Sequence, residues 1–388
     1  MSRPVRLAGP VLAGPVLAGT CGIALVLTGC AAKTDTSTGA AGGPIAVTMT
    51  DTTCEVARGE APAGTIEFAV TNTGSKVNEF YVYAEGDRIM GEVENISPGL
   101  TRSFHVDVSE PGSYETACKP GLVGDGIRAA FTVTGSSAAP KTENEQLTAA
   151  VAEYERYVGS QADAFLTETT EFVGLVKAGK VEEAKARYPT SRSSWERIEP
   201  VAESFGDLDP KIDGRAEVVD DGMTFTGFHR LEQDLWEQGL QPDTNAIADQ
   251  LLVDVTDLVT RAKAVELNAL QLANGSKALL DEIATGKITG EEERYSHTDL
   301  WDFEANFEGS RAAIQALRPF LTGVDPALVK TLDSRGDALE ALLESHRKGD
   351  GFVLYGELTK DDVKALTVAL DAFAEPVATV AGVVAAKQ

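Results

Sequence analysis

The residues of this chain best suited to chemistry lie in two short segments, residues 227–232 and 290–310. His229 and Glu232 stand three positions apart in a segment with helical patterning, so their side chains are expected on one helix face. An imidazole and a carboxylate on one face can share a divalent or ferric metal ion. The chain has only four histidines, and two of them, His229 and His297, lie in these segments. Metal binding is therefore the first hypothesis.

The second segment is rich in carboxylates. A single metal site uses only a few ligands, so most of these acids are expected to be solvated. Ser296 or Thr298 is expected to cap a helix that runs to about residue 317, which places Asp299 near the positive end of that helix. Capping and metal ligation both remain open for Asp299. The acids of the segment are Glu291, Glu292, Glu293, Asp299, Asp302, Glu304 and Glu308.

Glu196 and Glu199 stand three apart near the end of another predicted helix. One reading is a solvated acidic edge paired with Arg192 or Arg197. The other is that both carboxylates join His229 inside a helical bundle, where facing helices can assemble one metal site.

The pattern argues against a zinc peptidase of the His-Glu-x-x-His type, in which two imidazoles lie one turn apart. Only His229 occupies the helical turn here, although His297 could complete a site from a distance. The sequence shows no nucleophile elbow and no glycine-rich phosphate loop. A metallopeptidase remains the alternative function, and a polysaccharide- or partner-binding surface protein is a third.

The N-terminus reads as a secretory signal over residues 1–29, with two arginines before an apolar stretch. The junction Leu-Thr-Gly-Cys resembles a lipobox, in which the thiol of Cys30 receives diacylglycerol. Residues 30–43 are small and polar and predict a flexible tether. We therefore expect an extracytoplasmic protein that a lipid anchors to the cell membrane. An uncleaved membrane anchor is disfavoured because prolines and glycines interrupt the apolar stretch.

The formal charge is −26, and loss of the two signal-peptide arginines leaves −28. A domain this acidic repels nucleic acid and anionic headgroups, and its field attracts cations. Nucleic acid is therefore excluded as a partner, although solubility alone accounts for most of these charges.

Hydrophobic periodicity predicts a multidomain β + α protein. Residues 44–135 alternate with period two and predict six or seven short strands in a β-sandwich. After a linker at residues 136–142, residues 143–388 carry apolar stripes of helical period, and their breakers predict eight or nine helices of bundle type. The strand stripes include Ile66-Phe68-Val70, Phe80-Val82 against Tyr81-Tyr83, Phe104-Val106-Val108 and Phe131-Val133. The helical stripes include Leu147-Val151-Tyr154-Val158 and Leu251-Val255-Leu258, and the breakers include Pro189, Pro200 and Pro319.

Two cysteines, Cys54 and Cys118, remain after the signal and the lipid-modified position are set aside. In an oxidising compartment they predict a disulfide, and the alternative is a metal site with Glu79. A type-1 copper centre needs two histidines, but His105 is the only histidine of this domain.

Several longer motifs carry a family resemblance. The chain resembles the EfeO-type components of ferrous-iron uptake systems, in which a cupredoxin-like domain precedes an imelysin-like helical domain. The similarity covers nearly all of the mature chain. The motifs are Trp195-Glu196-Arg197-Ile198-Glu199-Pro200, Gly227-Phe228-His229-Arg230-Leu231-Glu232, Glu293-Arg294-Tyr295-Ser296-His297-Thr298-Asp299 and Glu94-Asn95-Ile96-Ser97-Pro98-Gly99.

The resemblance implies that His229 and Glu232 form a His-x-x-Glu metal motif for Fe²⁺ or Fe³⁺, with Glu196, Glu199 and Asp299 nearby. Copper or zinc could occupy the same positions in vitro. The implied function is to capture iron and deliver it to a membrane permease, without enzymatic activity. The implied partners are that iron permease and a heme peroxidase.

In the first domain the resemblance implies that Cys54, Glu79 and Cys118 fill proposed metal positions. A methionine is expected two residues before the second cysteine, and Thr116 stands there. This departure weakens the case for copper.

Overall fold

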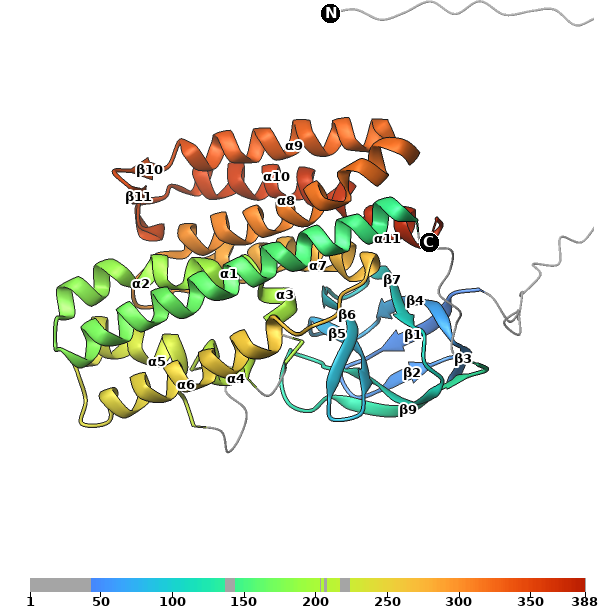
Figure 1. The fold of residues 1–388 in the computed structure, drawn as a ribbon, viewed down its shortest axis with the longest axis horizontal. Helices are drawn as coiled ribbons and strands as arrows, with labels where there is room; N and C mark the ends of the chain where they lie inside the picture. Colours follow the sequence, from blue (N-terminus) through green and yellow to red (C-terminus); the bar gives the residue numbers. More distant parts are fainter. Residues whose placement is uncertain (1–42, 137–143, 203, 206–207, 217–223, 388) are drawn as a thin grey trace, which may run out of the picture. The chain divides into compact units, whose positions relative to one another are not determined.

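The computed structural model describes residues 43–136, 144–202, 204–205, 208–216 and 224–387. Within these ranges a β-sheet part comes first, and a mostly helical part follows (Figure 1). The predicted signal peptide, Cys30, and nearly all of the predicted tether and linker lie outside the described residues.

Nine strands form the first part in the described chain, two or three more than expected, because the short strands β2 and β3 carry little pattern. One sheet has the order β2-β1-β4-β7 and the other β3-β9-β8-β5-β6. The strands of the first sheet are β1 (Ile45–Met49), β2 (Cys54–Val56), β4 (Gly64–Asn72) and β7 (Thr101–Val108). Those of the second are β3 (Glu60–Pro62), β5 (Asn78–Ala84), β6 (Arg88–Ile96), β8 (Gly112–Cys118) and β9 (Ile127–Thr134).

The sandwich core is aromatic and draws on both sheets. Phe68 of β4 lies 5.0 Å from Phe80 of β5 and 5.7 Å from Phe131 of β9, measured between ring centroids. Ile66, Phe68 and Val70 are buried on one face of β4, as the alternation predicted.

Strand β5 departs from simple alternation because both of its faces are buried. Tyr81 and Tyr83 stack at 5.3 Å on the side opposite the phenylalanine core. Lys119 and Arg128 lie over these two rings at 4.4 and 4.6 Å, so cationic side chains cover this outer aromatic pair.

The helical part contains long helices separated by short connecting segments. Helix α1 packs against α2, α6 and α8 (Figure 1). Leu147, Tyr154 and Val158 of its predicted stripe are buried, and Val151 is partly buried. The longer helices are α1 (Glu145–Lys177), α2 (Val181–Glu196), α6 (Thr244–Ala262), α7 (Ala269–Thr285), α8 (Asp299–Val324), α9 (Pro326–Glu344) and α10 (Lys360–Val377). The shorter ones are α3 (Glu199–Ala202), α4 (Asp209–Ile212), α5 (Gly227–Gln233), the π-helix η1 (Asp234–Gln238), the 3-10 turns η2 (Lys287–Thr289) and η3 (Tyr355–Glu357), and α11 (Val380–Ala385). A small hairpin, β10 (Arg347–Lys348) with β11 (Gly351–Phe352), precedes η3.

The prediction that helices break at Pro189 and Pro319 is wrong. Pro189 lies inside α2 and Pro319 lies inside α8. A proline removes one backbone hydrogen bond, but it is tolerated when tertiary packing holds the helix on both sides. Tyr188 and Phe320, the neighbours of the two prolines, are both fully buried and supply that packing.

In the described ranges, one helical stretch, Lys360–Ala385, is long and apolar enough to span a membrane by length and composition. Core helices of other proteins pass the same test. Leu366, Leu370, Phe373 and Val377 of this stretch are buried with the helical core.

Cys54 and Cys118 form a disulfide with a Cα–Cα distance of 5.6 Å. Cys54 lies on β2 of one sheet and Cys118 lies on β8 of the other, so the bond joins the two sheets of the sandwich. The sequence left a disulfide and a metal site open, and the disulfide is the arrangement found.

Replacing both cysteines by serine should destabilise the sandwich by about 2–4 kcal/mol, because the bond closes a loop of 64 residues in the unfolded chain. Hydrogen–deuterium exchange of peptides from β1 and β8 should accelerate accordingly. The internal control is tryptophan emission in a urea titration, which monitors unfolding of the helical part. All three tryptophans lie there, at Trp195, Trp236 and Trp301. Unchanged exchange in both strands would contradict the prediction.

Candidate metal-binding site

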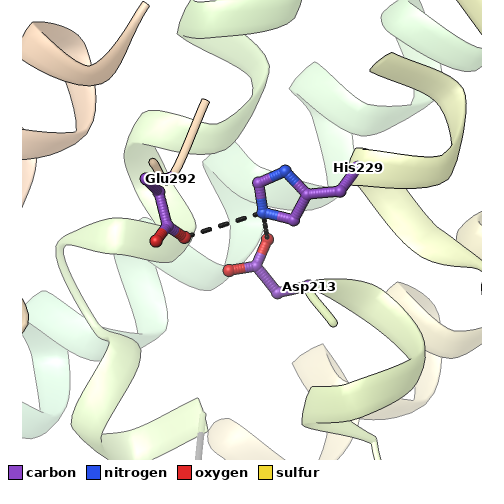
Figure 2. A group of neighbouring side chains, drawn as sticks. All are labelled: Asp213, His229 and Glu292. Atoms are coloured by element: carbon purple, nitrogen blue, oxygen red, sulfur yellow. Dashed lines mark ion pairs between the residues drawn. The ribbon is translucent and has the colours of Figure 1, made fainter. Parts of the chain in front are cut away.

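The candidate site lies in the helical part and draws on segments far apart in the chain. His229 and Glu232 lie on α5, and Asp213 directly follows α4. Glu292 and Glu293 lie in the loop before α8. Figure 2 shows the side chains of Asp213, His229 and Glu292 converging from three separate segments.

One edge of the His229 ring faces two carboxylates. Its Nε2 atom lies 3.5 Å from Asp213 Oδ1 and 3.6 Å from Glu292 Oε1 (Figure 2). The side chain is 2% exposed, and Nε2 has no hydrogen-bond partner. A buried nitrogen of this kind is a suitable metal-ligand atom.

The opposite edge of the ring is held by Glu232. Its Oε2 lies 3.3 Å from His229 Nδ1, and its Oε1 accepts hydrogen bonds from the backbone N–H groups of Tyr295 (2.9 Å) and Ser296 (2.7 Å). A carboxylate fixed in this way orients the imidazole and holds a proton on Nδ1, so a metal would bind at Nε2 in place of the proton there.

Two overlapping triads therefore share His229. Asp213, His229 and Glu292 form one, and His229, Glu232 and Glu293 form the other. In each triad the candidate ligand atoms lie within 4.8 Å of one another. We call Asp213, His229, Glu232, Glu292 and Glu293 the His229 pocket.

Gly227 brings α5 against α4. Its φ of +79° favours glycine, and a Cβ atom there would meet Lys211 O at 2.6 Å and Ile212 O closer still. This close approach places Asp213, just past α4, beside His229, just inside α5.

Arg192 of α2 is the main counter-charge of the pocket. Its guanidinium group is fully buried and pairs with Glu196 (2.6 Å), Glu293 (2.7 Å) and Asp213. The solvated-edge reading of Glu196 is therefore wrong, although its predicted pairing with Arg192 is correct. A planar guanidinium suits this role because its donors diverge toward several carboxylates.

Glu196 and Glu199 face a second buried cation. Lys287 Nζ lies 3.4 Å from Glu196 Oε2 and 3.4 Å from Glu199 Oε1. The amide nitrogen of Asn306 donates to Glu196 Oε2 (3.1 Å) and to Glu199 Oε2 (2.8 Å). Neither glutamate belongs to the two triads.

The environment keeps the carboxylates nearest His229 ionised. Burial raises the pKa of Asp213, but Arg192 and His229 outweigh it and lower that pKa below its usual value. Burial also raises the pKa values of Glu232 and Glu292, but their neighbours outweigh it and lower both below the usual value. The strongest of these neighbours is His229 for Glu232, and it is Lys287, followed by His229, for Glu292. The local field therefore favours a cation at this position.

The charges also act on the imidazole and on the remaining acids. Burial and Arg192 lower the pKa of His229, but the neighbouring carboxylates of Glu232, Glu292 and Asp213 outweigh them and raise it to about 10. Burial raises the pKa of Glu196, Glu199 and Glu293 each to about 8.

Asp299 begins α8, at the positive end of the helix as predicted, and its side chain is buried. Its Oδ1 accepts the Glu293 N–H at 3.1 Å, and its Oδ2 has no hydrogen-bond partner. Burial raises the pKa of Asp299 to about 6. Asp299 thus holds the loop that carries Glu292 and Glu293.

The other acids of residues 290–310 divide between core and surface. Glu291 and His297 are exposed, so His297 does not reach the pocket. Glu304 and Glu308 pair with Arg347 and Arg197 near the surface. Asp302 is buried, as are Glu292, Glu293 and Asp299, so the expectation that most of these acids are solvated is wrong.

Sequence reasoning missed Asp213 and the buried cations Arg192 and Lys287 as parts of the site, and it did not single out Glu292. No spacing rule connects Asp213 or Lys287 to His229, because their contact depends on packing. The one local signal was the concentration of three consecutive glutamates at residues 291–293.

In the sandwich, Glu79 lies on β5 beside the disulfide strand β8. It is 7% exposed, and Tyr81 Oη donates to its Oε2 at 2.7 Å. With both sulfurs in a disulfide, Cys54 and Cys118 offer no thiolate to a metal in this state.

A β-sandwich followed by a helical part with a buried imidazole–carboxylate pocket defines a two-domain protein of the cupredoxin-like and imelysin type. The imelysin model matches residues 150–380, and the cupredoxin-like domain model matches residues 20–133. The chain belongs to the imelysin family and is a homologue of the EfeO iron uptake system components.

The chain is 36% identical over 345 residues to the iron uptake system component EfeO of Escherichia coli O157:H7, covering 87% of this chain and 91% of the relative. The protein of the same description from Shigella flexneri matches with the same identity and coverage. A putative iron-regulated protein A precursor from Parabacteroides distasonis is a distant structural match, with a TM-score of 0.45 and 16% identity over 64% of this chain and 96% of that chain.

Replacing Gly227 by alanine should lower the free energy of unfolding by at least about 2 kcal/mol. Residue 227 has a left-handed backbone conformation, and a Cβ atom there would also collide with the backbone of α4. The matched control is Gly174→Ala in α1, where no atom lies within 4 Å of the added Cβ. The control should stabilise the helix by up to about 1 kcal/mol. Urea unfolding followed by tryptophan emission measures both, and equal midpoints for the two variants would contradict this account.

Proposed function

We propose that this protein is the extracytoplasmic metal-binding component of an iron uptake system. It captures an iron ion in the His229 pocket and delivers it to a membrane permease. The observation that carries the proposal is His229 Nε2, which is buried without a hydrogen-bond partner between Asp213 and Glu292.

The donor set suits iron. An imidazole nitrogen with carboxylate oxygens binds Fe²⁺ or Fe³⁺, and the same donors accept Zn²⁺ or Cu²⁺ in vitro. His229 Nε2, Asp213 and Glu292 are the proposed ligands, with Glu293 within reach of the same ring. Glu232 orients the imidazole through Nδ1. Glu196 and Glu199 act one layer further out, through Arg192 and Lys287.

The role in uptake rests on the relatives, which are described as iron uptake system components. A system of this kind needs a membrane protein that moves the ion, so a permease is the proposed acceptor and a heme peroxidase is a proposed further component. Lipid attachment at Cys30 would hold the protein at the membrane surface beside them.

A metallopeptidase fits the pocket less well. Such an enzyme needs a metal with an open coordination position, a general base and access for a peptide. His229 and Glu232 are 2% and 0% exposed, and Glu232 is already committed to Nδ1 and to two backbone N–H groups. Turnover of unfolded casein by the zinc-loaded protein, lost in Glu232→Gln, would reverse this ranking.

His229→Ala should weaken Fe²⁺ binding by more than about 100-fold, since it removes a ligand, and Glu232→Gln should weaken it by about 10–100-fold, since it removes only the orienting contact. Anaerobic calorimetric titration of the full mature chain measures both. His297→Ala is the matched control, because His297 is exposed, and it should bind as the unmodified protein does. Equal affinity in the unmodified and His229→Ala proteins would remove His229 from the site.

Cys30→Ser should abolish lipidation, because the thiol is the acceptor of the diacylglycerol group. The variant should be released or retained as a precursor, as judged by membrane fractionation and by metabolic labelling with a fatty acid. A labelled and processed variant in the membrane fraction would refute the anchor.

A further inference from the structure

The two oxygens of Glu292 face different partners. Its Oε1 lies 3.6 Å from His229 Nε2, while its Oε2 is turned away from the ring (Figure 2). Arg215 donates to that outer oxygen from Nη1 at 3.0 Å. Arg215 thus fixes the outer side of a proposed ligand, and it follows another proposed ligand, Asp213, by two residues.

The His229 pocket comes nearest to solvent on the side where Arg215 lies. The two carboxylates on the Nδ1 side are fully buried, and His229 is 2% exposed. Asp213 and Glu292 are 8% and 7% exposed, so an ion from solvent meets this side first. Arg215 stands there with 27% of its side chain exposed. Ligands this deeply buried are reached only if a covering group moves.

Arg215 differs from the two other fixed cations near Glu292. The side chains of Arg192 and Lys287 are fully buried, and each lies 3.8 Å from Glu292 Oε1. Neither can leave without stranding buried carboxylates, which is costly. A partly exposed guanidinium can leave its partner at a much smaller cost, because water replaces the hydrogen bond that it gives up. Of these three cations, Arg215 is therefore the one suited to move.

The backbone at Gly286, which ends α7, makes room for the pair. A Cβ atom at residue 286 would lie 2.9 Å from Glu292 Oε2 and 3.9 Å from Arg215 Nη1. A larger residue would push the outer oxygen away from the guanidinium. The close contact between Arg215 and Glu292 therefore depends on the glycine.

We propose that Arg215 is the gating residue of the His229 pocket, and that an ion enters or leaves only when the guanidinium swings away from Glu292 Oε2. The identity of the ion rests on the proposed function, whereas the cover that Arg215 provides does not. With an ion held at Oε1, Arg215 pairs with Oε2 again. The hydrogen bond is broken only during passage, so it slows entry and release alike and leaves the affinity nearly unchanged.

The test is the rate of Fe²⁺ entry and release in Arg215→Gln of the full mature chain, under anaerobic conditions. Trp195 is a built-in reporter, because its Nε1 donates to Asp213 Oδ2 at 3.1 Å. Stopped-flow quenching of tryptophan emission measures entry, and mixing of the loaded protein with a chelator measures release. Both rates should rise by roughly tenfold, as expected for the loss of one charge-assisted hydrogen bond, while Kd stays nearly constant.

Two further variants frame this result. Arg318→Gln is the matched control, because Arg318 is 34% exposed and pairs with Asp333 of α9, and its rates should not change. Arg215→Lys keeps the charge and should restore most of the slow entry.

Equal rates in Arg215→Gln and the unmodified protein overturn the gate. A weaker Kd with an unchanged entry rate also overturns it, since Arg215 would then only orient Glu292. If Arg215→Gln does not fold, Gly286→Ala takes its place, because the added Cβ separates the same pair. Both rates should again rise, and unchanged rates overturn the proposal.

Caesium ions separate the gate from the proposed function, because Cs⁺ quenches tryptophan on contact and needs no ligand set. Arg215→Gln should increase the quenching by Cs⁺, and the increase should vanish when Trp195 is also replaced by phenylalanine. If the unmodified protein binds no Fe²⁺, the proposed function fails, and stronger Cs⁺ quenching in Arg215→Gln still supports the gate. Equal Cs⁺ quenching in that case overturns it.

Discussion

The burial of more carboxylates than cations around one imidazole is the constraint on which the helical part depends. Each buried carboxylate must find a positive partner or hold a proton. Arg192 and Lys287 supply fixed positive charge from α2 and η2, and His229 supplies a third that a metal can replace. The core is therefore stable only when the helices, turns and loops that carry these groups are all in place.

The surplus charge is divided into two neighbouring groups with different chemistry. The His229 pocket combines an imidazole nitrogen with the ionised carboxylates of Asp213, Glu232 and Glu292. A second group, Glu196, Glu199 and Glu282, surrounds the ammonium of Lys287. Glu292 belongs to both surroundings. The proposed metal ion and the fixed charge of Lys287 would thus share Glu292, which would couple ion binding to the packing of the loop before α8.

The sandwich follows a different physical rule. Its core is aromatic, and its two cysteines are joined across the sheets. Glu79 and Tyr81 satisfy each other on β5, so the polar groups near the disulfide have protein partners. In this state the cysteines serve the fold, and the proposed metal site lies in the helical part.

The sequence by itself determined the features that depend on local periodicity. The stripe of β4 with Phe68, the helical stripe of α1, and the one-face spacing of His229 and Glu232 all follow from repeats of two or 3.6 residues. Tertiary structure alone decided that Asp213 meets His229, that Lys287 lies between Glu196 and Glu199, and that α2 continues through Pro189. Those outcomes depend on contacts between segments far apart in the chain. There, packing and the pairing of buried charge outweigh local preference.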